Sequence, residues 1–151
     1  MRSHLVSVFV LSLFAGAMAT SGAQAQEWAG TVKAVAGAAT VERSGKSAPL
    51  ALGDRVFPGD KLSSGKDGRI GITLRDDTLI AAGANSQLAL KDFAFNAATQ
   101  EGSVVVAVLR GITAMVTGLV AKAHPEAMRV VTPTSTIGIR GTEFVVEVES
   151  E

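Results

Sequence analysis

Apolar and polar residues alternate along much of this chain. Residues 70–74 keep one parity apolar, and residues 80–90 keep one parity mostly apolar over eleven positions. A period of two is typical of β-strands with one buried face. The Gly-Ala-Asn-Ser stretch at 83–86 interrupts the second segment, so we expect a bend or a break there.

The segment 129–148 also has a strand-like pattern, and turn-forming residues interrupt it at two places. Thr132-Pro133 halts an apolar run, and Arg140-Gly141-Thr142 breaks the next one. Residues 143–148 then alternate glutamate with Phe or Val, which predicts a half-buried final strand. The Arg-Gly-Thr break is interpreted mainly as a tight turn with glycine at positive φ, and a partner-facing Arg140 is the functional alternative.

The apolar run 104–121 allows several interpretations. Its length is nearly that of a membrane span, but Arg110 at mid-span would cost about 2.5–3.5 kcal/mol on insertion. Val104–Val108 is rich in β-branched residues, which favours a buried strand. We expect two strands across 104–122 with a turn near Arg110-Gly111, and the alanines leave a helix open as the alternative.

Two similar turns stand in the first third of the chain. Gly53-Asp54 and Gly59-Asp60 lie six residues apart, each before an apolar strand position. Glycine tolerates positive φ and aspartate accepts hydrogen bonds from nearby backbone, so both pairs predict turns. Short strands at regular spacing with Gly/Asp turns predict a compact all-β domain, as an antiparallel sandwich, a barrel or a short β-solenoid.

The N-terminus predicts export. One arginine, a 15-residue apolar stretch and the small-x-small sequence Ala23-Gln24-Ala25 are typical of a secretory signal peptide. We therefore expect a signal peptide at 1–25 and one domain at 26–151, in the periplasm or secreted, with an uncleaved anchor as the alternative. The chain has no cysteine, which excludes lipid attachment through a cysteine and disulfide bonds.

Composition argues against several functions. Fourteen basic and fourteen acidic residues are scattered without runs, so no nucleic-acid or anionic-lipid footprint is expected. Tyrosine is absent and Trp28 is the only tryptophan, so stacking platforms for sugars are scarce. His124 is the only histidine beyond the signal peptide, too few for a zinc site and without a nucleophile motif.

We accordingly predict no catalytic, cofactor-binding or metal-binding residues. The acidic residues in glycine-rich turns are interpreted as turn formers rather than calcium ligands, because the spacing of an EF-hand is missing. These residues are Asp54, Asp60, Asp67, Asp76 and Asp77.

Five elements in order resemble the FecR domain, a bacterial extracytoplasmic all-β module. They are Gly30, Val32 and Gly37; Gly53-Asp54 with Gly59-Asp60; Ile70, Ile72, Leu74, Asp76 and Thr78; Asn85-Ser86 with Leu88 and Leu90; and Thr132-Pro133, Gly138, Arg140-Gly141-Thr142 and Phe144. Asp77 stands where the family usually has glycine, so we expect a different type of turn there.

The resemblance implies a stand-alone exported FecR-domain protein, because the anti-sigma, transmembrane and receptor-contacting segments of the family's signalling members find no match in the sequence. We expect a non-enzymatic interaction or sensing module of the bacterial envelope that needs no cofactor. Its partner would be an envelope protein, such as an outer-membrane receptor or a regulatory protein. The exposed edge of the final strand, Glu143–Val148, is the expected contact. The alternative is a cell-wall or polysaccharide-binding module.

Overall fold

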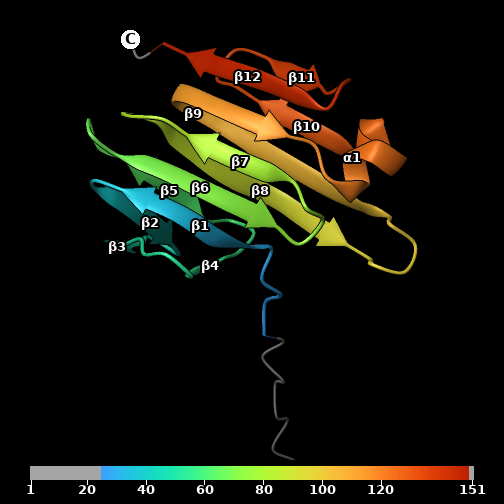
Figure 1. Cartoon of the computed structure of the whole chain (residues 1–151), viewed down its shortest axis with the longest axis horizontal. Coiled ribbons are helices and arrows are strands. Elements are labelled where there is room, and N and C mark those ends of the chain that lie inside the picture. The colour runs from blue at the N-terminus through green and yellow to red at the C-terminus, as the bar shows by residue number, and fades with distance from the viewer. Residues whose placement is uncertain (1–24, 150–151) are drawn as a thin grey trace, which may run out of the picture.

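The computed structural model describes residues 25–149, so residues 1–24 of the predicted signal peptide and the last two residues lie outside it. Across the described residues, twelve strands form one curled sheet (Figure 1). The prediction of an all-β domain of short, mostly antiparallel strands is thereby confirmed. No helix in this part of the chain is long and apolar enough to cross a membrane.

The curled sheet has two halves that share one long strand, β9 (Gly102–Val116). The first half-sheet runs β4–β1–β6–β7–β9–β12, an order that Figure 1 shows from β1 up to β12. Besides β9 it contains β1 (Gly30–Ala36), β4 (Arg55–Val56), β6 (Arg69–Leu74), β7 (Leu79–Ala82) and β12 (Glu143–Val148). The second half-sheet runs β3–β2–β5–β8–β9–β10–β11. It adds β2 (Ala39–Arg43), β3 (Lys46–Pro49), β5 (Lys61–Ser64), β8 (Gln87–Phe95), β10 (Met128–Val131) and β11 (Thr136–Gly138).

One pair of neighbouring strands, β9 and β10, is parallel. Parallel neighbours need a crossover connection, which α1 (Leu119–Ala123) and the 3₁₀ turn η1 (Pro125–Ala127) supply. The turn between β6 and β7 holds the start of α1. The N–H of Gly118 donates to Thr78 Oγ1 at 3.1 Å, and the N–H of Leu119 donates to the carbonyl of Asp76 at 2.6 Å.

That β6–β7 turn also contains Asp77, the departure from the family pattern. Asp77 has φ of 66°, the left-handed conformation that glycine adopts most readily and that Asp tolerates better than most residues. The aspartate therefore keeps the glycine-like backbone that this position of the turn requires.

The core lies inside the curl and draws on both half-sheets. Ile72 and Met115 of the first half-sheet and Leu88 and Val106 of the second belong to one buried cluster. The period-two pattern accounts for this, since each strand turns one parity inward and the other outward. Each fully buried Val, Leu or Met contributes about 1.5–3 kcal/mol relative to an exposed one.

The expectation for 104–122 was partly wrong. The segment does not form two strands with a turn: β9 continues through Arg110-Gly111 to Val116, and only Leu119–Ala123 is helical. The glycine marks a bend within a continuous strand. The register with β8 slips by one residue at this point, as in a β-bulge. This bend carries β9 from the second half-sheet into the first.

Ser86 fixes the bend. Residues 83–86 separate β7 from β8, as expected, and thus pass between the half-sheets at the same level as Gly111. The N–H of Ile112 donates to Ser86 Oγ at 3.0 Å, and that hydroxyl donates to the carbonyl of Ile112 at 3.1 Å. Gly111 has φ of 80°, and a Cβ added there would lie 2.6 Å from the Cα of Ser86. The contact therefore requires glycine for both conformation and space.

Gly111→Ala should lower the free energy of unfolding by about 2–4 kcal/mol, which combines a left-handed alanine with an overpacked contact. Gly45→Ala is the matched control, because φ is 75° there and no atom lies within 4 Å of the added Cβ. The control should lose only about 1 kcal/mol. Urea unfolding of both variants measures the difference, and equal losses would show that Ser86 does not fix the bend.

The two Gly-Asp turns are built alike. Asp54 Oδ2 accepts from the N–H of Ala51, and Asp60 Oδ2 accepts from the N–H of Phe57, each at 2.8 Å. Asp60 differs in being fully buried and in binding Arg43 through both oxygens, at 2.7 and 2.6 Å. The hydrogen bond to Asp60 raises the pKa of Arg43 above its ordinary value. A cation with a raised pKa stabilises the fold at every pH below its unfolded pKa, so this contribution is constant around neutrality.

Asp60→Asn should cost about 1–3 kcal/mol of stability, because it removes a buried charge-assisted pair with the half-exposed Arg43. Asp54→Asn is the matched control, since it changes an equivalent turn that has no arginine. We expect the control to cost less than about 1 kcal/mol in chemical unfolding. Similar losses for both variants would contradict a role for the Arg43 pair.

Candidate functional site

The final strand β12 lies at an edge of the first half-sheet. It pairs with β9 on one side, and no described strand pairs with its other side. The equivalent outer position in the second half-sheet, beside β10, is filled by β11. The structure therefore places an open strand position next to β12, where the sequence predicted an exposed edge.

The register shows which backbone groups of β12 face outward. The N–H of Thr117 donates to the carbonyl of Thr142 at 2.8 Å, directly before the β9–β12 ladder. Opposed residues in an antiparallel ladder alternate between hydrogen-bonded and non-bonded pairs. Phe144, Val146 and Val148 consequently bond to β9. The N–H and C=O groups of the other three residues, Glu143, Val145 and Glu147, point away from it.

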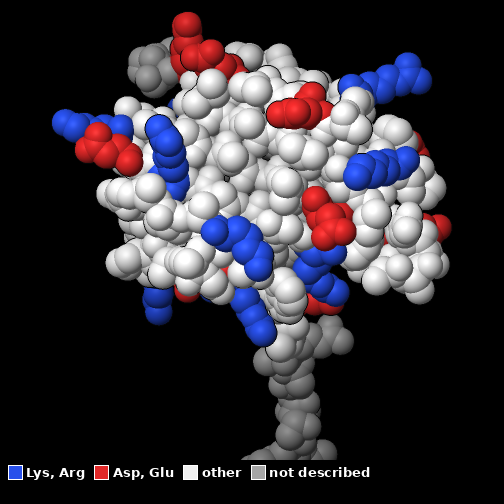
Figure 2. Space-filling view, in the orientation of Figure 1, with Lys and Arg blue, Asp and Glu red and all other residues white. Residues whose placement is uncertain are grey.

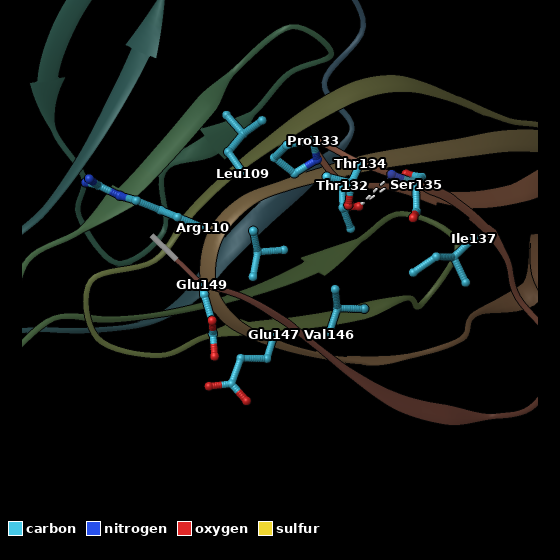
Figure 3. Close-up of a pocket in the computed structure, with 11 residues that line it drawn as sticks. Leu109, Arg110, Thr132, Pro133, Thr134, Ser135, Ile137, Val146, Glu147 and Glu149 are labelled. Carbon is cyan, nitrogen blue, oxygen red and sulfur yellow. Dashed lines mark hydrogen bonds between the residues drawn. The ribbon is translucent and has the colours of Figure 1, made fainter. Parts of the chain in front are cut away.

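A groove of about 860 Å³ lies where the partners of β9 change. The ladder with β10 ends at Ala107 and the ladder with β12 ends at Gly111, so Leu109 and Arg110 between them contribute to the groove. The other lining residues are Thr132, Pro133, Thr134, Ser135, Ile137, Val146, Glu147, Val148 and Glu149. Figure 3 shows the 132–135 turn on one side and Val146, Glu147 and Glu149 on the opposite side.

Apolar side chains, hydroxyl groups, two carboxylates and Arg110 line the groove, and no aromatic ring does. The carboxylates of Glu147 and Glu149 lie near each other, whereas the Arg110 side chain extends in a different direction (Figure 3). With Glu143, three glutamates thus accompany the open edge. Such charges discourage uncontrolled pairing of edges and favour a cationic partner.

Both predicted breaks in the C-terminal segment are turns in the structure. Pro133-Thr134 form the two-residue turn between β10 and β11, closed by a 2.8 Å bond from the N–H of Thr132 to the carbonyl of Ser135. Gly141 has φ of 129°, and Thr117 Oγ1 donates to its carbonyl at 3.1 Å. The Arg-Gly-Thr break is therefore a turn that places β12 against β9, and Arg140 within it is exposed.

The other titratable residues considered in the sequence are dispersed. His124 closes α1 and lies 3.6 Å from Glu126. Asp76 is buried and accepts from both the N–H and the hydroxyl of Thr78. Within residues 25–149, no three His, Cys, Asp or Glu side chains come together in a way that could hold a metal ion.

Trp28, the only tryptophan, contacts two arginine side chains of the protein itself. The guanidinium groups of Arg55 and Arg75 lie 5.3 and 5.4 Å from its ring centre. These are cation–π contacts. The ring is thus engaged away from the groove.

Sequence reasoning identified the edge but not the groove. In the sequence, Thr132-Pro133 predicts only the end of a strand, and Arg110 only disfavours insertion into a membrane. Their proximity to the end of β12 depends on the parallel β9–β10 pair, for which the local pattern holds no signal.

Comparison with known proteins gives a family match. The family model described as FecR protein matches residues 60–151. A solved structure titled "Cell surface anchoring domain" is similar at 29% identity and a TM-score of 0.39, over 40% of this chain and 82% of that one. Curated proteins give no significant match.

The matched segment begins at Asp60 and includes β12 together with every residue that lines the groove. Strands β1–β4 precede it, and two of them pair with strands inside it: β1 with β6 and β2 with β5. The match spans more than half of the chain. The chain therefore belongs to the FecR family.

Proposed function

We propose that this chain is a non-enzymatic protein-interaction module of the bacterial envelope, which acts after export in the periplasm or outside the cell. The FecR family is associated with the bacterial envelope and with regulation, which supports this role. The observation that carries the proposal is the open edge of β12, with the outward-facing backbone groups of Glu143, Val145 and Glu147.

An extended peptide segment of an envelope protein is the partner that fits this edge best. Strand addition supplies main-chain hydrogen bonds, and side-chain pockets supply specificity. Here the groove at the end of β12 offers such a pocket, and the three glutamates favour lysine or arginine in the added strand. A sensing or regulatory role would follow from the identity of the captured envelope protein, for which an outer-membrane receptor or a regulatory protein is expected.

The alternative of a cell-wall or polysaccharide ligand finds less support. Sugar sites commonly stack a sugar ring on an aromatic side chain, but no aromatic residue lines the groove and Trp28 is covered by two arginines. Sedimentation of the protein with purified peptidoglycan tests this alternative directly. Retention that does not depend on β12 would favour it over peptide capture.

Val145→Pro should abolish partner capture and leave the fold intact, because the lost N–H points away from β9 and proline is tolerated there. Val145→Thr is the matched control, since threonine is β-branched and keeps the N–H. A photoreactive residue in place of Ser135, at the groove, reports capture in cells. The same residue in place of Leu52, which is 70% exposed on the distant Ala51–Asp54 turn, reports background.

We expect crosslinks from position 135 in the parent chain and in Val145→Thr, and none in Val145→Pro. Thermal unfolding of the three proteins checks that the fold is unchanged. Crosslinks from position 135 that survive in Val145→Pro would refute strand addition at β12. Equal crosslinking from positions 52 and 135 would refute a specific site.

A further inference from the structure

The outer face of the first half-sheet is apolar over most of its area. Leu79, Ile112 and Val145 are 46%, 43% and 60% exposed on it. Figure 2 shows a broad face without charge, with the charged side chains mainly around its margin. Water-exposed apolar faces of this extent usually mark an interaction surface.

Small residues form the central row of this face. Gly71, Ala81, Ala114 and Val145 lie side by side on β6, β7, β9 and β12, as the strand registers show. A shallow hollow of about 420 Å³ with an almost wholly apolar lining covers this row. A row of small residues leaves the sheet flat enough for another sheet to approach to about 10 Å.

The face is complementary to itself. A twofold axis along the strands, midway between β7 and β9, would place β7 over β9 and β6 over β12 of a second copy. In the central row, Ala81 would meet Ala114 and the Val145 side chain would meet the space above Gly71. One surface patch then serves both copies, as in most homodimers.

The charged residues Arg69 and Glu147 are also complementary under this twofold axis. Arg69 of β6 and Glu147 of β12 belong to the same outer row, since Gly83 lies opposite Ile112 and Ile112 opposite Glu147. Three strand spacings separate them, about 14 Å, so they do not meet within one chain. Neither takes part in an ion pair within residues 25–149. The twofold axis brings Arg69 of each copy opposite Glu147 of the other, which forms two symmetric ion pairs.

The area suits a weak dimer. The four paired strands β6, β7, β9 and β12 lie about 4.8 Å apart and, with three outward rows, span about 19 Å by 20 Å, or about 380 Å² of each copy. Two copies would bury about 760 Å² in total, which is below the roughly 1,000 Å² of a stable specific interface and suits a weak association. A dissociation constant in the micromolar range is therefore expected.

We propose that the outer face of the first half-sheet binds a second copy of this chain, face to face, with Arg69 of each copy paired to Glu147 of the other. The dimer would be a sandwich of two half-sheets, whose strand directions typically differ by about 30°. It leaves the outer edge of β12 open, so it neither requires nor prevents the peptide capture proposed above.

Sedimentation equilibrium of the full chain from about 1 to 500 μM tests the proposal at concentrations that bracket micromolar association. Ala81→Arg places a charge at the centre of the face and should weaken association at least about tenfold, without changing monomer stability. Lys33→Ala, an exposed change on β1 away from the pairing rows, is the control and should leave association unchanged.

A charge exchange tests the arrangement of the two copies. Arg69→Glu and Glu147→Arg should each weaken the dimer about tenfold, because each sets two like-charge pairs opposite one another. The double variant Arg69→Glu/Glu147→Arg should restore association to near the parent value. A chain that stays monomeric at the highest concentration, or a dimer insensitive to Ala81→Arg, would overturn the proposal. A double variant that remains weak would overturn the proposed symmetry.

The experiments distinguish failure of the dimer proposal from failure of the peptide-capture proposal. Ala81→Arg leaves β12 and the groove unchanged, so crosslinking from position 135 should persist in this variant. Loss of the dimer with retained crosslinking would show that peptide capture does not require the dimer.

Discussion

The bend of β9 at Gly111 is the constraint on which the rest of the structure depends. A single strand contacts β8 and β10 before the bend and β7 and β12 after it. Ser86 fixes the bend through its hydroxyl, which exchanges hydrogen bonds with both backbone groups of Ile112. Without this bend the sheet could not curl around one core, since β9 is the strand that both half-sheets share.

The same bend creates the candidate site. β9 changes direction between Ala107 and Gly111. Strands β10 and β12 therefore pair with separate parts of β9 and leave a gap between their ladders. Their ends diverge around Leu109 and Arg110, and the groove occupies the space between them. The open edge of β12 begins at this groove. Architecture and candidate function thus have one physical origin.

Both proposed surfaces belong to the first half-sheet but use different properties of it. Peptide capture uses backbone groups at the edge of β12, whereas dimerisation uses side chains on the outer face. Glu143, Val145 and Glu147 contribute to both, because in β12 the residues with outward backbone groups also carry the outward side chains. A family module with few special residues can therefore offer two surfaces from one short strand.

Alternation of apolar residues predicted the all-β class, the break at 83–86 and the punctuation of the last three strands. The Gly-Asp turns and the outward-facing residues of β12 were also predictable, since turn chemistry and strand parity are local properties. The path of β9 was not: residues 104–116 are apolar except at Arg110, Gly111 and Thr113, and a bulge plus one left-handed glycine replaces the turn that Arg110-Gly111 predicted. The groove and the charge symmetry of Arg69 and Glu147 were decided by tertiary structure alone. They arise from strands far apart in the chain, and a local pattern carries no information about which strands become neighbours.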